Sequence, residues 1–528
     1  MKNKGKLLEF LTLFAMTIGS VVGAGVYFKN KEILFDTRNP IIAIILWIIV
    51  GSVCVSMVYL FLEIASSTKK GGSGTIGVWT KLFINRKVGS FFAILNAFFY
   101  LPVMQSMFIS FFITFILMMF STVQLKGIHF LLIFLTTGIA IIIINALINV
   151  FDLSISRKYQ AFGTIFKFIP LAIALIAGVV LFDQNGAFLS GGINITNPTG
   201  GTSKVEWSTS NFNPLLFFRG FGGILFAFDG FIFICNSQRK AKYKDVVPKA
   251  LIFGMIFVSV FYTLIAVSLL MGSPDGSIGA LLGKLFNGGK VLNSSDNSTL
   301  SRVANILTSV IIIIICSIGA NNLSYVSFVV IESDVIDKLY LTSQKNISAK
   351  RIAIIQVSVA TAIYSTFILV GTLATVGLSN TATVEQAVSS TNGLIYPIQI
   401  VATSNTCLSF IMIITLIIGA LFNRKTNKVE VEKKKGFVVL GTIAACCLIL
   451  FVTMSLFTIL VPLDVINKNN NNSNWFTSNY YQGPLFILLT LLELGSVFIF
   501  WCTQEKKKKK IWFGKSWNSN HSKTYNLV

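Results

Sequence analysis

Two charged side chains inside apolar segments are the residues best suited to do chemistry in this sequence. Lys167 lies within the apolar segment 160–182, and Asp229 lies within the segment 214–236. A charge at the centre of a membrane span costs about 2.5–3.5 kcal/mol on insertion scales, so such a residue is a functional candidate by default. Loss of water favours the neutral form of a lysine, which can then release and regain a proton.

Each of the two residues also has a simpler interpretation. Lys167 lies only about two turns into its segment, so its long side chain could reach the membrane surface. Asp229 could pair with a cationic substrate group, accept a proton, or bond nearby backbone amides, as aspartate does in non-helical turns. These alternatives stay open, and both residues remain candidates for a site.

Two glycine-rich stretches interrupt membrane-length segments at corresponding places in the two halves of the chain. They are residues 19–25 and residues 220–230. Glycine destabilises a helix interior by roughly 1 kcal/mol relative to alanine, and backbone groups freed inside a bilayer need partners. Paired breaks therefore predict a binding site near the midplane of a secondary transporter. The alternative is that these glycines only let helices pack closely.

The two breaks offer different main-chain groups to a ligand. Unwinding near Val22 would present amides at the end of a half-helix, where the dipole favours a carboxylate. Freed carbonyls in the second break would accept hydrogen bonds from an ammonium group. Together they describe a site for an α-amino acid. The predicted substrate-binding residues in the two stretches are Ser20, Val22, Gly23, Ala24, Gly25, Phe226, Ala227, Phe228 and Asp229.

The composition predicts an all-α, polytopic membrane protein. Of 528 residues, 54% are hydrophobic and 12% are charged, which is too little polar surface for a soluble chain of this size. We predict twelve transmembrane helices from the length that hydrocarbon requires. They cover about residues 8–28, 41–62, 89–120, 128–150, 160–182, 214–236, 246–272, 303–331, 350–371, 391–420, 437–463 and 483–503.

The net charge of +23 is unevenly distributed between the predicted loops. Most Lys and Arg residues fall on one side if the amino terminus is cytoplasmic, which predicts a cell-membrane protein with both termini cytoplasmic. The run Lys506–Lys510 is expected to contact anionic lipid at that face. This distribution argues against nucleic acid as a partner.

Metal, cofactor and enzyme chemistry have no support in the sequence. The seven cysteines show no CxxC spacing, and we interpret them as small core residues. The two histidines, His129 and His521, are far apart and near no cluster of carboxylates. No acid, base or nucleophile pair stands out, so we expect no enzyme activity.

The recurrence of the break in span six predicts two inverted repeats of five spans each. The transport core would then occupy residues 1–422, with two appended transmembrane helices at 423–503 and a basic cytoplasmic tail at 504–528. Asn96, Tyr100, Asn321, Asn322 and Ser324 could line the pocket or form interhelical hydrogen bonds.

Five stretches resemble the amino acid–polyamine–organocation (APC) superfamily of permeases, all within residues 7–255. They are Ile18–Phe28, Tyr59–Glu63 followed by Gly71-Gly72, Asn149–Ser154 followed by Thr164–Lys167, Phe226–Phe231 and Asp245–Ala250. The resemblance implies a five-plus-five inverted repeat with broken helices one and six and an amino acid held between the breaks.

The resemblance also implies roles for single residues. The amides of Val22–Gly25 would bind the carboxylate, the carbonyls of Phe226–Phe228 would bind the amino group, and Phe231 would be an aromatic gate. In proton-coupled relatives, a lysine at the position of Lys167 sits beside the first break and replaces a bound sodium ion. One departure is Asn236–Arg239, where family members commonly carry acidic residues; inner gating that relies on those acids is in doubt.

These observations predict a secondary active transporter that imports amino acids by alternating access and couples to protons through Lys167. One alternative is an exchanger of one amino acid for another, or for a polyamine formed by decarboxylation. Another is a ligand sensor on a permease scaffold that does not transport.

Overall fold

The chain folds into long helices with little sheet. The computed structural model describes residues 2–68, 74–120, 123–151, 153–183, 185–196, 202–210, 212–230, 243, 246–291, 299–340, 348–388, 394–461 and 482–516. The helices up to residue 228 are α1 (Lys2–Val21), α2 (Ala24–Thr37), α3 (Pro40–Ser66), α4 (Ile76–Phe83), α5 (Arg86–Leu95), the π-helical turn η1 (Asn96–Tyr100), α6 (Leu101–Met118), α7 (Gly127–Phe151), α8 (Leu153–Val180), α9 (Ala187–Ser190), α10 (Pro214–Arg219) and α11 (Phe221–Phe228). Those that follow are α13 (Val247–Gly272), α14 (Ile278–Phe286), α15 (Thr299–Ile336), α16 (Ala349–Thr375), α17 (Val384–Val388), α18 (Tyr396–Thr426), α19 (Phe437–Leu460) and α21 (Gln482–Ser516).

Nine helices among the described residues are long and apolar enough to cross a membrane. Each of them coincides with a span predicted from the sequence. Two shorter apolar helices, Ile165–Val180 and Pro214–Phe228, coincide with predicted spans five and six, and predicted span one is divided between α1 and α2. The chain is therefore a polytopic membrane protein. Helix α8, which contains Lys167, runs from Leu153 to Val180, and predicted spans one and six are the two that contain a predicted break. The total of twelve spans and the inverted repeat stay predictions.

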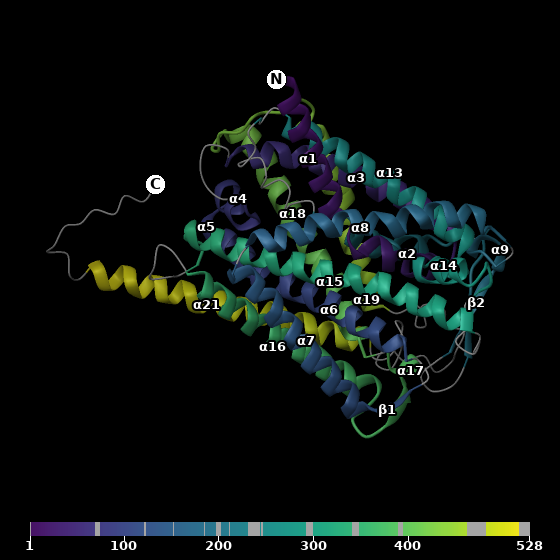
Figure 1. Ribbon diagram of the computed structural model, residues 1–528. Coiled ribbons are helices and arrows are strands. Elements are labelled where there is room, and N and C mark those ends of the chain that lie inside the picture. The colour runs from purple at the N-terminus through teal and green to yellow at the C-terminus, as the bar shows by residue number, and fades with distance from the viewer. Residues whose placement is uncertain are drawn as a thin grey trace.

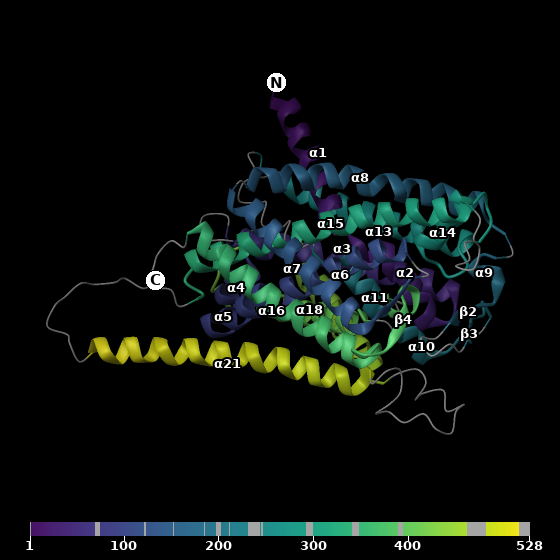
Figure 2. The same ribbon diagram turned by 60° about the horizontal axis from the view of Figure 1, so that its bottom comes forward.

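The long helices lie alongside one another, with shorter elements gathered at the two ends of the bundle (Figures 1 and 2). One end carries α9, α14 and the antiparallel pair β2 (Gly192–Thr196) and β3 (Thr202–Glu206). The other end carries α4 and the start of α5. A second antiparallel pair joins β1 (Gln124–Lys126) to β4 (Thr381–Thr383). Helix α21 runs along one side and extends past the α4–α5 end (Figure 2).

Polar residues fix where two of the helices begin at the α9–β2 end. The Asn39 side chain accepts hydrogen bonds from the amides of the second and third residues of α3, which starts at Pro40. Asn213 caps α10 in the same way, again with a proline in the first turn. Such a cap stabilises a helix by about 1 kcal/mol, and proline is preorganised for the first helical position. Both helices pack against α2, which carries one side of the site.

Candidate functional site

The first predicted break lies between α1 and α2. The amide of Val22 still donates to the carbonyl of Ile18, 2.8 Å away, and the chain then turns at Gly23, whose φ is −121° and ψ is −154°. Helix α2 starts at Ala24, and Gly23 offers no side chain to cap it. The first amides of a helix have no acceptor within the helix, so the start of α2 presents donors to the site. Gly25 is the second residue of α2, and Ser20 lies within α1.

The second predicted break lies at the end of α11. Phe228 is the last helical residue, Asp229 is extended with φ −64° and ψ 153°, and Gly230 has φ 98°. Only glycine adopts that positive φ without a steric penalty. The carbonyl of Phe226 accepts a hydrogen bond from the amide of Asp229, 3.4 Å away, whereas that of Ala227 accepts from no amide of a following turn among the described residues. Phe231 and Asn236–Arg239 lie outside the described residues, so their predicted roles stay predictions.

Only part of each glycine-rich stretch is unwound. Gly19 lies inside α1, and Gly222 and Gly223 lie inside α11. A Cβ atom on Gly223 would lie 3.0 Å from Cγ1 of Ile33, so that glycine allows α11 to approach α2 closely. Some of these glycines therefore lie where the helix is interrupted, and others lie inside a helix and allow close packing.

The two breaks touch one another. A Cβ atom placed on Gly25 would overlap Cα of Ala227 and lie 2.8 Å from its Cβ. The start of α2 thus lies against the last turn of α11. Because a helix carries partial positive charge at its start and partial negative charge at its end, donors and acceptors lie side by side here.

Tyr262 of α13 links the two breaks, and sequence reasoning did not single it out. Its hydroxyl donates to the carbonyl of Val21, 2.9 Å away, and lies 3.4 Å from the carbonyl oxygen of Ala227. The ring is fully buried and packs against Trp47 and Phe228, with centroid distances of 5.4 and 5.2 Å. One hydroxyl hydrogen can serve only one carbonyl at a time. One of the two therefore stays available to another donor.

Lys167 is directed at the first break. Its ammonium nitrogen lies 3.5 Å from the carbonyl oxygen of Val22, which is long for a hydrogen bond. Its own carbonyl accepts a hydrogen bond from the hydroxyl of Tyr27 in α2. The residue is 3% exposed and has no carboxylate within ion-pair distance among the described residues. The side chain therefore lies in the protein interior and does not extend to the membrane surface.

Asp229 bonds its own neighbour and two other helices. One carboxylate oxygen accepts from the hydroxyl of Tyr100, 2.6 Å away. The other accepts from the amide of Gly230 at 2.9 Å and from the hydroxyl of Ser409 in α18 at 3.4 Å. Tyr100 ends the π-helical turn η1, and such turns are frequent at functional sites. The expected bond to a backbone amide is present, and Tyr100 belongs to the same cluster.

Lys29 is a second residue that sequence reasoning missed. It lies one residue beyond predicted span 8–28 and so counted as a loop lysine, but α2 continues to Thr37. Its ammonium contacts the carboxylate of Glu32 and lies 3.3 Å from the hydroxyl of Thr403 in α18. It also lies 5.0 Å from the centroid of the Phe226 ring. Lys29 is buried and belongs to the surroundings of the breaks.

Ser324, another of the candidate pocket residues, takes part in interhelical contacts. The side-chain amide of Asn149 in α7 donates to the hydroxyl of Ser324 in α15, 2.9 Å away. Gln356 of α16 donates to the same hydroxyl at 2.8 Å. Ser324 therefore ties three helices together, which is the alternative that the sequence left open for it.

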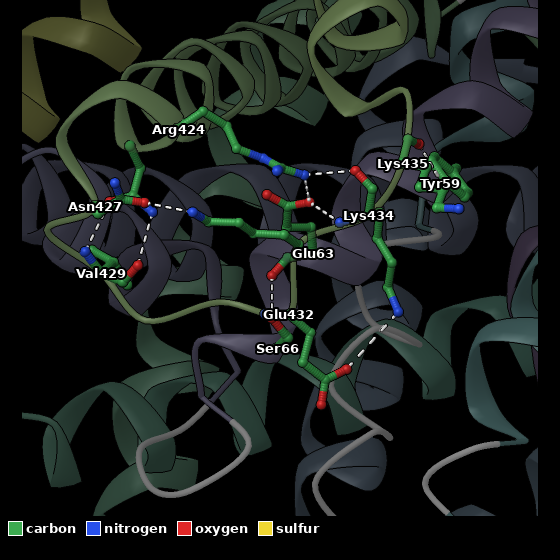
Figure 3. Close-up of polar contacts among 11 residues, drawn as sticks. Tyr59, Glu63, Ser66, Arg424, Asn427, Val429, Glu432, Lys434 and Lys435 are labelled. Carbon is green, nitrogen blue, oxygen red and sulfur yellow. Dashed lines mark hydrogen bonds and ion pairs between the residues drawn. The ribbon is translucent and has the colours of Figure 1, made fainter.

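A cluster of charges at the α4–α5 end ties the end of α3 to the segment between α18 and α19 (Figure 3). The buried carboxylate of Glu63 accepts hydrogen bonds from the guanidinium of Arg424 at 2.5 Å and from the amide of Lys434 at 2.7 Å. Ser66 accepts from the amide of Glu432 at 2.8 Å. Glu63 belongs to a stretch that carries the APC resemblance. Its contacts with Arg424 and Lys434 hold the segment between α18 and α19 against the end of α3.

The fold and the two adjoining breaks define a class of protein. Interrupted membrane helices whose freed main-chain groups meet inside the bundle are a feature of secondary transporters. Residues 8–492 match the family of amino acid permeases, and the chain belongs to that family, within the APC superfamily. Its members are transporters and not enzymes, which confirms the prediction from the sequence that the chain is not an enzyme.

The chain is also similar to an uncharacterized protein of Mycoplasma pneumoniae (strain ATCC 29342 / M129 / Subtype 1). The two are 24% identical over an alignment of 495 positions that covers 86% of this chain and 85% of that protein. The similarity thus extends over most of both chains.

Proposed function

We propose that this permease imports amino acids by alternating access and holds the substrate between the breaks at Gly23 and Asp229. The contact between Gly25 and Ala227 carries the proposal, because it brings the amides of α2 beside the carbonyls of α11. The amides of Val22–Gly25 would bind the carboxylate, and the carbonyls of Phe226–Phe228 the amino group. Helix dipoles favour both interactions.

We further propose that transport is coupled to protons through Lys167. When protonated, its ammonium interacts favourably with the Val22 carbonyl and stabilises the end of α1. When neutral, it loses that attraction, and the break is free to rearrange as the site opens to the other side. The absence of a carboxylate partner among the described residues supports a reversible charge, since a buried lysine without one is easily neutralised.

We propose the same organisation for the whole chain as the sequence predicts. Residues 1–422 form the transport core, 423–503 add two helices and 504–528 form a basic tail. The chain lies in the cell membrane with both termini in the cytoplasm, and lysines such as Lys506 face anionic lipid. The distribution of basic residues supports this orientation.

Uptake into liposomes tests the proton coupling. We expect purified parent protein to accumulate amino acids in response to an inward proton gradient and Lys167→Gln to lose that response. Lys158→Gln is the matched control, because Lys158 lies on the same helix and is exposed. If Lys167→Gln keeps the full dependence on the gradient, the proposed role of Lys167 is wrong.

The same vesicles separate import from exchange and from sensing. Uptake into vesicles without internal substrate supports import, whereas uptake that requires an internal amino acid or polyamine identifies an exchanger. Binding without uptake under either condition identifies a sensor.

A further inference from the structure

Lys29 brings a positive charge to the edge of the proposed substrate site. Its ammonium lies between α2, α11 and α18, 5.0 Å from the Phe226 ring centroid and 3.3 Å from the Thr403 hydroxyl. Its Cβ lies 3.8 Å from the position that a Cβ atom on Gly223 would take. From Ala24 to Lys29, α2 rises about 7.5 Å. Lys29 therefore lies about one and a half turns along α2 from the donors that would hold a substrate carboxylate.

The described partners of Lys29 compensate its charge only in part. Among the described residues its one ion pair is with Glu32, whose side chain is 41% exposed, whereas that of Lys29 is 5% exposed. An ion pair with an exposed partner contributes little to stability, and burial of an ammonium is costly. The nearby carboxylate of Asp36 is paired with Arg219. A second anion at the Lys29 ammonium would therefore be stabilised.

The carboxylate of Asp229, which directly follows the last helical residue of α11, is already bonded. It accepts from Tyr100, Gly230 and Ser409 at 2.6, 2.9 and 3.4 Å. A cationic substrate group would have to displace these donors, and it would be repelled by Lys29. The charges around the site thus favour a negative side chain over a positive one.

We propose that Lys29 and Thr403 form a subsite for a side-chain carboxylate, so that the permease prefers acidic amino acids. This inference rests on the proposed function, in which main-chain groups hold the α-carboxylate and the α-amino group. The side chain of aspartate or glutamate then reaches the Lys29 ammonium and displaces Glu32 toward water. It also takes the hydrogen of the Thr403 hydroxyl, which otherwise goes to the carbonyl of Gln399, 3.1 Å away. A charge-assisted hydrogen bond of this kind is among the stronger polar contacts in proteins.

Binding of two isosteric pairs to the detergent-purified parent protein tests the subsite without any mutation. We expect L-aspartate to bind at least about tenfold more tightly than L-asparagine, and L-glutamate than L-glutamine, by calorimetry. Equal or tighter binding of the two amides would overturn the subsite while leaving amino acid transport intact. If no amino acid binds, the proposed function fails as well.

Three variants locate the preference at Lys29. We expect Lys29→Met to bring the affinities for each acid and its amide to within about twofold of one another, and Lys29→Arg to keep the preference for acids. Lys31→Met is the matched control, because Lys31 lies on the same helix but pairs with Asp275 outside the site. Equal loss for acids and amides in Lys29→Met would contradict the subsite. If Lys29→Met does not fold, Lys29→Arg and the parent comparison still decide the outcome.

Discussion

Gly25 and Ala227 are in backbone contact, which leaves no room for a Cβ atom on Gly25. We expect Gly25→Ala to push α2 away from α11 and to separate the proposed carboxylate and amino-group sites. Overpacking of this kind costs about 1–3 kcal/mol, which corresponds to roughly 5- to 150-fold weaker binding if it opposes the bound state alone. Thermal stabilisation of the purified protein by amino acids measures the loss.

Gly495→Ala is the control for this substitution, because nothing lies within 4 Å of the added Cβ atom on α21. It should bind amino acids like the parent. Parental binding by Gly25→Ala would mean that the contact between the breaks does not support the substrate site.

Tyr262→Phe removes the hydroxyl that lies within hydrogen-bond distance of the carbonyls of both Val21 and Ala227. Among the described residues, no other side chain makes contacts of this kind with both breaks. The Val21 carbonyl then loses a partner 2.9 Å away, while the aromatic packing against Trp47 and Phe228 is kept. A net hydrogen bond contributes about 1 kcal/mol, so we expect about fivefold weaker substrate binding together with a small fall in melting temperature. Calorimetric titration with the transported amino acid measures the first effect.

Tyr364→Phe separates a binding role from a purely structural one. Tyr364 is also fully buried and donates to a backbone carbonyl, that of Phe134 at 2.8 Å, but it joins α16 to α7. It should lower the melting temperature to a similar extent without changing substrate affinity. If both variants change affinity equally, Tyr262 has no special part in the site.

The breaks could be predicted from sequence because glycine is costly in a membrane helix, but their exact residues could not. Gly23 and Gly230 lie at the turns, whereas Gly223 lies inside α11 and makes room for Ile33. A glycine that unwinds a helix and one that lets helices approach look alike in a sequence. Only the packed neighbour distinguishes them.

Polar residues with partners inside the protein were the hardest to place from sequence. A hydropathy limit ended the first span before Lys29, although α2 continues to Thr37 and buries that ammonium. Tyr262 resembles any other aromatic residue of a span until α13 is packed against both breaks. Lys167 was found because an isolated charge stands out among apolar residues, but its contact with Val22 depends on tertiary packing.

Glu63→Gln should destabilise the α4–α5 end. The Glu63 side chain is 2% exposed and that of Arg424 is 19% exposed, and loss of one partner of a buried pair costs about 3–5 kcal/mol. The amide would still accept one bond but would leave the guanidinium without its counter-charge. We expect a lower melting temperature and faster proteolysis between residues 427 and 436, which Glu63 anchors through Lys434.

Glu432→Gln provides the comparison for Glu63→Gln. Its side chain is 52% exposed and its ion pair with Lys434 spans 3.9 Å, so we expect a change within about 0.5 kcal/mol. Equal protease sensitivity in the two variants would show that the Glu63 cluster does not hold the segment.

Asp275 makes the α9–β2 end sensitive to acid. Burial raises the pKa of its carboxyl, but Lys31 and the hydrogen bonds from Ser277 outweigh burial and lower the pKa from 3.8 to about 2. A carboxyl with a depressed pKa contributes stability that is fully present above its unfolded pKa and is lost as the pH falls through its folded pKa. The contribution at pH 7 is about 2 kcal/mol, and it declines from about pH 4 toward pH 2.

We therefore expect Asp275→Asn to melt at a lower temperature than the parent at pH 7 and the difference to shrink below pH 4. The physical reason is that the protonated parent carboxyl no longer attracts the Lys31 ammonium, 2.9 Å from it in the folded protein. Glu206→Gln is the control, because Glu206 pairs with Lys204 in the exposed strand β3. Melting curves of the three proteins between pH 7 and pH 3 measure the effect, and a difference that stays constant over this range would contradict the assigned pKa.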